Sequence, residues 1–268
     1  MKKIVVIIPV YQNNISEDES LSMRLAAKFL SSYSVIFIAP EGFDSQRKYN
    51  QLLLGSWKYF PEEYFKSPST YSKLMLSSFF YKSFSEYGYM LIYQLDGLVL
   101  NRSLEYWCSL GYSYIGAPLR FSALGLLCHQ ERKFFEVVGN GGISLRKISD
   151  FYKLLHDRET LDKNTFSWLY FIASILSGKT AKKWMNVSPK KYPFNEDGYW
   201  SFEAEKYDKN FSVAPLDIAA QFSLERFPSY FSRKYLEGEL PFAAHAWKKY
   251  ELEWWEEKFS KHKNRFDS

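Results

Sequence analysis

Continuous apolar runs and helix-spaced apolar positions alternate along the first part of the chain. Residues 4–8 are all Ile or Val, and the runs at 34–39 and 89–93 are also largely apolar. Between the first two runs, apolar side chains recur at helical spacing over residues 20–30. A continuous apolar strand is typical of a parallel sheet that is covered on both faces. The pattern therefore predicts a doubly wound α/β fold with a mostly parallel central sheet flanked by helices.

Weaker patterns predict the remaining elements. An amphipathic helix is expected over residues 71–87, where Gly88 ends it, and a short strand over 112–116. Residues 137–146 read as a strand pair around a glycine-rich turn. Further helices are predicted over 146–155, 166–176 and 247–266, with a loop-rich stretch before about residue 244. Because no repeat, linker or composition break divides the chain, we expect one domain.

Charge and composition exclude some classes of function. The net charge is +5, but the 35 basic and 30 acidic residues are interspersed along most of the chain. Nucleic-acid binding is therefore not predicted, because its usual signature is a basic patch or arm. Aromatic residues make up 19% of the chain. They could stack on sugar rings or bases, but an aromatic-rich core explains them more simply.

The cysteines and the N-terminus bear on location. Cys108 and Cys128 show neither a metal-binding spacing nor a disulfide framework, which favours a reducing cytoplasm. The apolar run at 4–10 is too short for a signal peptide and lacks a small-residue cleavage site. No window approaches the roughly 20 apolar residues that span a bilayer. We therefore predict a cytoplasmic protein.

Asp96 is the first candidate for chemistry. It follows the predicted strand at 89–93 and precedes Gly97. In open α/β sheets, ligands bind at the carboxyl ends of the strands, where a carboxylate can hold a hard cation. Capping of the following turn is an equally good explanation of this residue taken alone.

Gly139-Asn140-Gly141-Gly142 is the second candidate. Its glycines permit positive φ and a close approach of the backbone to a ligand, and Asn140 offers both a donor and an acceptor. Asn-Gly is also the strongest local signal for a hairpin turn. Taken alone, the segment favours the hairpin.

The third and fourth candidates lie towards the C-terminus. In Asn195-Glu196-Asp197, adjacent carboxylates repel, which can raise the pKa of one of them towards the range of a general base. A charged surface loop is the alternative. His245 lies in an apolar segment, where a hydrogen-bonded core histidine is more common than a metal ligand.

Together, these features resemble the core of GT-A-fold glycosyltransferases: an Asp motif after a strand, a glycine-rich loop, an x-Glu-Asp motif and a C-terminal histidine. The chain is still more similar to a bacterial family of uncharacterised, glycosyltransferase-like proteins. The phrases that carry this similarity are Ala39-Pro40-Glu41-Gly42, Tyr93-Gln94-Leu95-Asp96, Tyr114-Ile115-Gly116-Ala117-Pro118, Gly139-Asn140-Gly141-Gly142, Asn195-Glu196-Asp197 with Trp200, and Pro241-Phe242 with His245-Ala246-Trp247.

The resemblance implies a GT-A-like domain over residues 1–250 and a helical tail over 251–268. A nucleotide-sugar half would cover about 1–118 and an acceptor half about 119–250. Asp96 and His245 would bind Mn²⁺ or Mg²⁺, and Asp197, with Glu196 beside it, would supply the catalytic base. The donor would contact Tyr71, Lys73, Gln94, Asp96, Asn140, Gly141 and Gly142. Gln94 stands where the family's metal motif has its first Asp, so the metal is expected to be weakly held.

The resulting hypothesis is an inverting, metal-assisted glycosyltransferase. It would move a sugar from a nucleotide-sugar donor to a glycan or lipid-linked acceptor in bacterial surface polysaccharide or glycoconjugate synthesis. The alternative is a non-catalytic nucleotide-sugar or carbohydrate-binding protein. A weaker hypothesis places the C-terminal helix peripherally on the inner face of the membrane, because Trp247, Trp254 and Trp255 lie among lysines. A helix that docks on the domain through its tryptophans explains the same pattern better.

Overall fold

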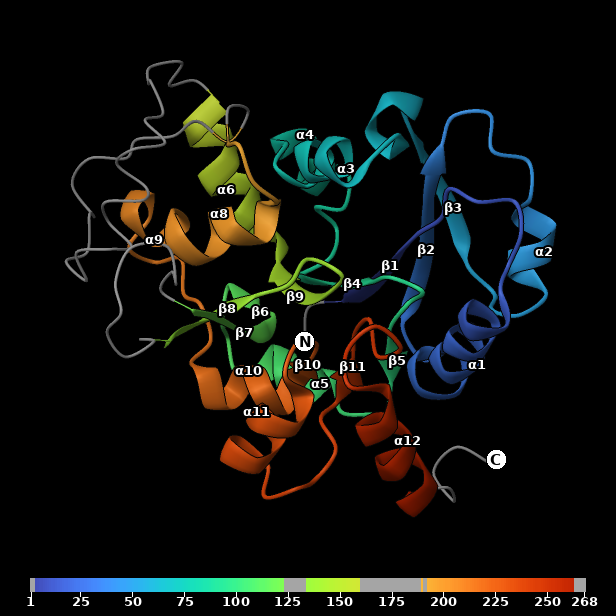
Figure 1. The fold of residues 1–268 in the computed structure, drawn as a ribbon. Helices are drawn as coiled ribbons and strands as arrows, with labels where there is room; N and C mark the ends of the chain where they lie inside the picture. Colours follow the sequence, from blue (N-terminus) through green and yellow to red (C-terminus); the bar gives the residue numbers. More distant parts are fainter. Residues whose placement is uncertain (1–2, 123–133, 160–188, 190–191, 263–268) are drawn as a thin grey trace.

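A central sheet with helices on both faces organises the molecule (Figure 1). The computed structural model describes residues 3–122, 134–159, 189 and 192–262. Within these residues the central sheet has the strand order β3-β2-β1-β4-β9-β6. Neighbouring strands from β3 to β4 are parallel, and β9 is antiparallel to both of its neighbours. The sheet strands are β1 (Ile4–Pro9), β2 (Ser34–Pro40), β3 (Ser56–Phe60), β4 (Tyr89–Tyr93), β6 (Tyr114–Ile115) and β9 (Ile143–Lys147). The predicted fold class, a mostly parallel sheet flanked by helices, is confirmed.

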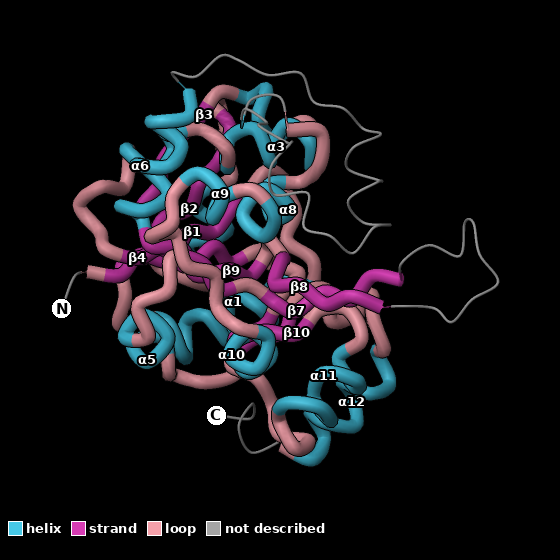
Figure 2. Tube along the Cα trace, turned by 90° about the vertical axis from the view of Figure 1, so that its left-hand side faces the viewer, coloured by secondary structure: helices cyan, strands magenta, loops and turns pink. Residues whose placement is uncertain are grey.

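Two smaller sheets complete the described strands. One joins β5 (Leu98–Val99), β10 (Ser223–Leu224) and β11 (Ala243–Ala244). The other is the ribbon of β7 (Ala117–Ser122) and β8 (Phe134–Gly139), which projects from the body of the molecule (Figure 2). The described helices are α1 (Glu17–Leu30), α2 (Gln46–Asn50), η1 (Glu62–Phe65), α3 (Pro68–Met75), α4 (Ser78–Lys82), α5 (Leu104–Ser109), α6 (Ile148–Glu159), α8 (Glu196–Phe202), α9 (Ala204–Tyr207), α10 (Leu216–Phe222), α11 (Pro228–Tyr235) and α12 (Leu252–Lys261).

Strand β1 explains why the core lies on both faces of the sheet. Its side chains alternate between two clusters: Val6 and Ile8 pack with α1, α5 and α10 to α12, whereas Val5 and Ile7 pack with α3, α4, α6 and α8. Every residue of β1 is buried, as the continuous apolar run predicts. Figure 1 shows the same two helical layers below and above the sheet.

The predicted helix over residues 71–87 is wrong as a single element. The chain forms α3 and α4 instead, separated at Leu76 and Ser77. The Ser77 hydroxyl donates a hydrogen bond to the Leu74 carbonyl at 2.7 Å, and the Ser77 backbone is extended. A serine that bonds the local backbone in this way competes with helix continuation.

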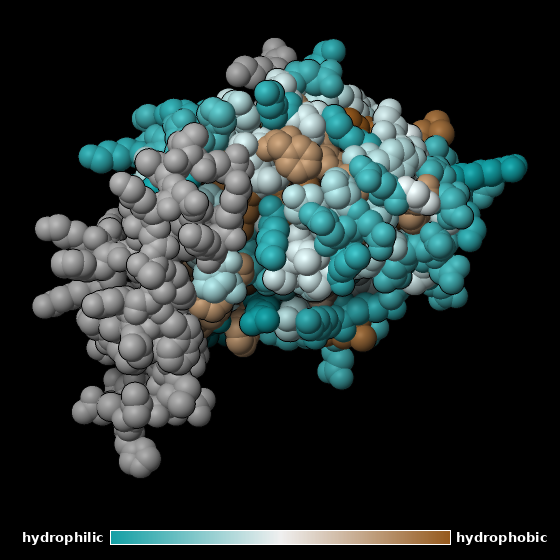
Figure 3. Space-filling view, turned by 90° about the horizontal axis from the view of Figure 1, so that it is seen from above, coloured by the Kyte–Doolittle hydropathy of each residue, from teal (hydrophilic) through white to brown (hydrophobic). Residues whose placement is uncertain are grey.

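Figure 3, which views the molecule from the side on which α3 and α4 lie, shows a mainly hydrophilic surface with hydrophobic side chains singly or in small groups.

The predicted hairpin around the glycine-rich turn is also wrong. Strands β8 and β9 both form, but they do not pair with each other: β8 pairs with β7, and β9 pairs with β4 and β6. The glycine-rich loop is therefore a crossover between two sheets. Asn140 takes a positive φ of 75° there, a conformation that asparagine tolerates better than most residues.

The remaining elements differ mainly in extent. The helix expected from residue 146 begins at Ile148, because Arg146 is still part of β9. The stretch that was expected to be loop-rich contains α8 to α11. The helix predicted over 166–176, and Cys128, lie outside the described residues.

The C-terminal helix α12 is shorter than predicted and docks on the domain. Trp247 and Trp255 are buried in the core, and Trp254 packs against it. Lys248 forms an ion pair with Asp18 at 2.6 Å. The tryptophans are therefore engaged within the protein rather than presented on an outer face.

Candidate functional site

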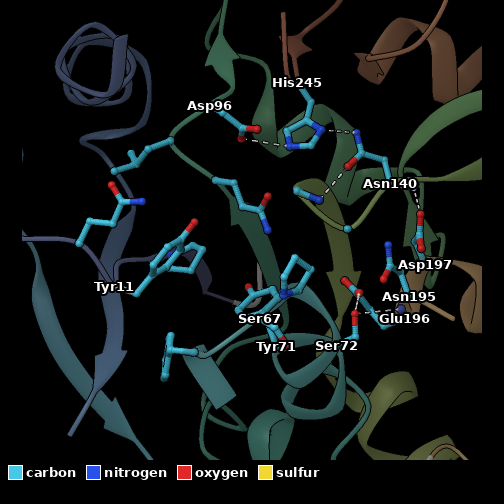
Figure 4. A pocket seen from close by; sticks show the side chains of 18 of the residues that line it. Tyr11, Ser67, Tyr71, Ser72, Asp96, Asn140, Asn195, Glu196, Asp197 and His245 are labelled. Atoms are coloured by element: carbon cyan, nitrogen blue, oxygen red, sulfur yellow. Dashed lines mark hydrogen bonds and ion pairs between the residues drawn. The ribbon is translucent and has the colours of Figure 1, made fainter. Parts of the chain in front are cut away.

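One cavity of about 690 Å³ lies at the carboxyl ends of β1 and β4 (Figure 4). The loop after β4 supplies Gln94 and Asp96, and the glycine-rich loop after β8 supplies Asn140. The first turn of α8 and the segment after β11 complete the wall. Four motifs far apart in the sequence therefore meet at one place, at the edge where an α/β sheet binds ligands.

Asp96 and His245 face each other across the upper wall in Figure 4. Asp96 Oδ1 lies 3.1 Å from His245 Nε2, and Glu225 Oε2 lies 3.8 Å from Nδ1. Burial by itself lowers the pKa of His245, but the hydrogen bonds and charges of Asp96 and Glu225 outweigh it and raise the pKa to about 9. Burial conversely raises the pKa of Asp96, and the contact with His245 brings it below its ordinary value.

Asn140 connects the histidine to the glycine-rich loop and to α8. Its side-chain amide lies 3.1 Å from His245 Nδ1, and its side-chain carbonyl accepts a hydrogen bond from the Gly142 backbone at 2.7 Å. The Asn140 backbone N–H donates to Asp197 Oδ2 at 3.0 Å. Asn140, with its positive φ, thus fixes the positions of both His245 and Asp197.

The glycines of this loop lie so close to neighbouring side chains that a residue with a Cβ atom would clash with them. A Cβ atom at Gly141 would lie 2.1 Å from Glu196 Oε1, and one at Gly142 would lie 2.0 Å from His245 Nε2. A Cβ at Gly139 would lie 2.4 Å from Leu119 Cδ1. The loop backbone therefore packs directly on the side chains that line the cavity.

We expect Gly142→Ala to displace the His245 imidazole and to destabilise the protein by about 1–3 kcal/mol, because the added methyl group has no space. Urea unfolding measures the stability, and the imidazole NMR signals of His245 report its environment. Gly111→Ala is the control for the His245 signals, because nothing lies within 4 Å of the added atom; its positive φ adds backbone strain but involves no contact with His245. Unchanged His245 signals in Gly142→Ala would contradict the packing described here.

Asp197 is the titratable group best suited to proton transfer in this cavity. Its carboxylate accepts backbone hydrogen bonds from Asn140 at 3.0 Å and from its neighbour Gly198 at 2.9 Å. Burial, followed by the negative charge of Glu196, raises its pKa to about 6 despite these two donors. A carboxyl group with such a pKa can exchange a proton near neutral pH.

Glu196 has a different environment from its neighbour. Its Oε1 forms an ion pair with Arg146 Nη2 at 3.1 Å, and its Oε2 accepts a hydrogen bond from Ser72 at 2.8 Å. Arg146 is fully buried, and only 5% of the Glu196 side chain is exposed. Of the two adjacent carboxylates of the motif, Glu196 is therefore the buried partner of Arg146, whereas Asp197 is held by backbone N–H groups.

The structure brings together most of the side chains that the sequence singled out. Tyr71 and Gln94 line the cavity with the four motifs, and the Tyr71 hydroxyl is buried without a hydrogen-bond partner in the part of the chain that the structure describes. Gln94 also joins its loop to the glycine-rich loop through a 2.9 Å hydrogen bond from its N–H to the Gly142 carbonyl. Lys73 is exposed on α3 and does not line the cavity.

Sequence reasoning missed several residues of the site. Arg146 and Ser72 hold Glu196, and Tyr11 and Glu225 line the cavity. Arg146 left a signal, because Ser144 and Arg146 alternate with the apolar Ile143 and Leu145 and so point to the same face. Glu225 left no comparable signal, because it follows a two-residue strand that the pattern did not predict.

Asp96 and His245 are the candidate ligands for a divalent cation. Within the residues that the structure describes, no three His, Cys, Asp or Glu side chains form a metal-binding group. His245 Nε2 is nevertheless buried, faces a carboxylate oxygen and lacks a hydrogen-bond partner of good geometry. With the imidazole in its neutral form, this pair fits a cation that takes its other ligands from water and substrate phosphates, which is how Mg²⁺ is commonly held.

The excess of acidic side chains around the cavity also favours a divalent cation. Lys66 and His245 are its basic lining residues among those described, and its acidic ones are Asp18, Glu19, Asp96, Glu196, Asp197 and Glu225. An anionic diphosphate in this surrounding needs a counter-charge, and a divalent cation supplies one.

Comparison of the sequence with known families assigns the chain. Residues 56–245 match the family described as "Protein of unknown function (DUF5672)". The chain belongs to this family. The match includes the Asp96, glycine-rich loop and Asp197 motifs and ends at His245. No protein with a curated description matches the chain.

Solved structures with a similar arrangement are described as glycosyltransferases. The mannosyltransferase Ktr4p from S. cerevisiae in complex with GDP has 10% identity and a TM-score of 0.43 over 59% of this chain and 61% of its own. Glycosyltransferase GlyE of Streptococcus pneumoniae has 10% identity and a TM-score of 0.44 over 99% and 62%. Mouse xyloside xylosyltransferase 1 has 12% identity and a TM-score of 0.46 over 91% and 97%. The matched region thus spans about three fifths of the first two proteins.

The helices were also compared with the length of a membrane span. Among the described residues, no helix is both long enough and apolar enough to cross a bilayer.

Proposed function

We propose that this protein is a glycosyltransferase that moves a sugar from a nucleotide-sugar donor to a glycan or lipid-linked acceptor, with inversion and with help from a divalent metal. The observation that carries the proposal is the convergence of Asp96, His245, Asn140 and Asp197 in one cavity at the carboxyl edge of the sheet. The Asp96 and His245 side chains lie at one end of this group and a carboxyl group with a raised pKa at the other.

In the proposed reaction, Asp197 takes the proton of the acceptor hydroxyl as its oxygen attacks the anomeric carbon. The donor diphosphate lies on the Asp96 and His245 side, and the glycine-rich loop holds the sugar between the two ends. The hydroxyl of Tyr71 and the amide of Gln94 bind donor hydroxyl groups at the floor of the cavity. When bound, Mn²⁺ or Mg²⁺ offsets the negative charge that develops on the departing diphosphate.

We expect uridine or guanosine diphosphate to raise the melting temperature when Mn²⁺ or Mg²⁺ is present. At a hundredfold excess over its dissociation constant, such a ligand stabilises the folded state by about 2.7 kcal/mol. Asp96→Ala should abolish the metal-dependent shift and leave the fold intact, because 58% of the Asp96 side chain is exposed. Glu62→Ala is a control on another exposed carboxylate outside the cavity. Failure of every nucleotide to shift the transition would exclude the donor-binding proposal.

A non-catalytic nucleotide-sugar or carbohydrate-binding protein is the second candidate. Gln94 favours it, because an amide replaces a carboxylate beside Asp96 and is a poor ligand for a metal. Such a protein would be stabilised by a nucleotide sugar but would release no free sugar from it.

Bacterial surface polysaccharide or glycoconjugate synthesis in the cytoplasm is the setting we propose for this activity. Contact of α12 with an anionic membrane would depend on its basic side chains, since Trp247 and Trp255 are buried. Flotation with anionic liposomes tests this contact.

A further inference from the structure

The buried cation behind the cavity floor is Arg146, which the proposed reaction does not use. Its guanidinium group is surrounded by polar partners from several elements. Nη1 donates to the Tyr81 hydroxyl at 2.8 Å, Nε donates to the Ser144 hydroxyl at 3.1 Å, and Nη2 donates to the Gly141 carbonyl at 3.4 Å. The remaining partner is Glu196 at 3.1 Å. Arg146 thus joins α4, the glycine-rich loop and the first turn of α8.

The two carboxylates of that first turn are held by unlike partners. Glu196 has a buried cation and the Ser72 hydroxyl, whereas Asp197 has two backbone N–H groups and, among the described residues, no cation within ion-pair distance. Two adjacent carboxylates, of which Glu196 is buried and Asp197 is half-buried, do not both remain ionised at low cost, so one of them takes up a proton first. A fully buried arginine stays charged, and its partner carboxylate carries the matching negative charge.

We propose that Arg146 is a positioning residue that, through its ion pair with Glu196, decides which of these two carboxylates takes up a proton and assigns that proton to Asp197. The catalytic meaning of this assignment rests on the proposed function, but the assignment itself does not. Arg146 and Glu196 touch no substrate in this account. They keep one carboxylate ionised within its ion pair, so that its neighbour accepts and releases the proton.

The groups around Asp197 support this arrangement. Glu196 on α8 and Glu225 after β10 both raise its pKa through their negative charge, after the larger contribution of burial. Two tyrosine hydroxyls lie close to Asp197. Tyr114 on β6 donates its hydroxyl hydrogen to the Asn140 carbonyl, and Tyr192 lies in the segment before α8. Burial and the charge of Asp197 both raise the pKa of these two tyrosines. The backbone N–H groups of Asn140 and Gly198 oppose these effects and favour the ionised form.

Loss of the cation should reverse the assignment. Without Arg146, Glu196 would be a buried carboxylate with only the Ser72 hydroxyl, whereas Asp197 would keep its two N–H donors. The proton would then pass to Glu196, and Asp197 would ionise at lower pH. Arg146→Lys keeps the charge but lacks the planar group that reaches all four partners, so it separates charge from geometry.

The test is a pH titration of the full chain with ¹³C-labelled Asp and Glu carboxyl groups. Loss of the Asp197 signal in Asp197→Asn assigns it. We expect a midpoint near 6 for Asp197 in the native protein. Glu196→Gln and Arg146→Met should each lower this midpoint by about one pH unit, because the neighbouring negative charge is lost. Arg146→Lys should stay close to the native value.

Glu203→Gln is the matched control, because Glu203 is a buried carboxylate at the far end of α8 that pairs with Lys206. It should leave the Asp197 midpoint unchanged. If Arg146→Met does not fold, Glu196→Gln and Arg146→Lys still decide the proposal. An unchanged midpoint in Glu196→Gln, or a lowered one in Arg146→Lys, would overturn it. Because no turnover is measured, failure of the proposed sugar transfer would leave this result intact, and the reverse also holds.

Discussion

Asp197→Asn is expected to lower sugar transfer by about a hundredfold to ten-thousandfold while nucleotide-sugar affinity stays within a few-fold. Asparagine has nearly the same shape but lacks the basicity to take a proton from the acceptor hydroxyl. The donor contacts lie elsewhere in the cavity, at Asp96 and the glycine-rich loop. Steady-state rates and donor binding measured on the same preparation separate the two effects.

The pH dependence of the native enzyme provides the companion result. Burial and the charge of Glu196 raise the pKa of Asp197 to about 6, and the base acts only when it is ionised. The rate should therefore be constant above this value and fall about tenfold per pH unit below it. A rate that is independent of pH between about 4.5 and 7.5, or full activity in Asp197→Asn, would assign the proton transfer to another group.

Arg146→Met is expected to lower the free energy of unfolding by about 3–5 kcal/mol, because it leaves Glu196 buried without its cation. Such a loss is a large fraction of the stability of an ordinary domain. Denaturant unfolding followed by circular dichroism measures it.

The matched control removes an exposed ion pair. Glu62→Gln breaks the contact with Lys66 at 3.9 Å, where 71% and 63% of the two side chains are exposed, and should leave stability nearly unchanged. Equal denaturant midpoints of unfolding for Arg146→Met and the native protein would show that the ion pair of Arg146 with Glu196 does not hold α8 against the glycine-rich loop.

The parts of the fold that followed from the sequence are those in which one face pattern dominates. The runs at β1, β2 and β4 are buried on both sides, so their continuous hydrophobicity could only suit the middle of a covered sheet. Where short-range signals competed with tertiary contacts, the sequence was misleading. Ser77 divides the helix predicted over 71–87 through one side-chain hydrogen bond, and apolar periodicity does not report such a bond.

The glycine-rich loop shows the same limit at the site. Asn140-Gly141 is a strong hairpin signal, yet β8 and β9 join different sheets, because β8 pairs with the preceding strand β7 whereas β9 pairs with β4, which lies much earlier in the sequence. The separate environments of Glu196 and Asp197 could not be predicted either. They depend on Arg146 and Ser72, which reach the motif from β9 and α3. The sequence shows that Glu196 and Asp197 are adjacent and repel each other. Only the fold determines that Arg146 pairs with Glu196.

The most direct test of the central claim is to follow nucleotide sugars by proton NMR in the presence of the full chain and Mn²⁺. The account predicts slow release or transfer of the sugar from one donor, with the first product in the inverted anomeric configuration, and no release in Asp197→Asn at the same donor occupancy. A nucleotide sugar that binds the native protein in this cavity and is never consumed, with any acceptor offered, would contradict the assignment as a glycosyltransferase.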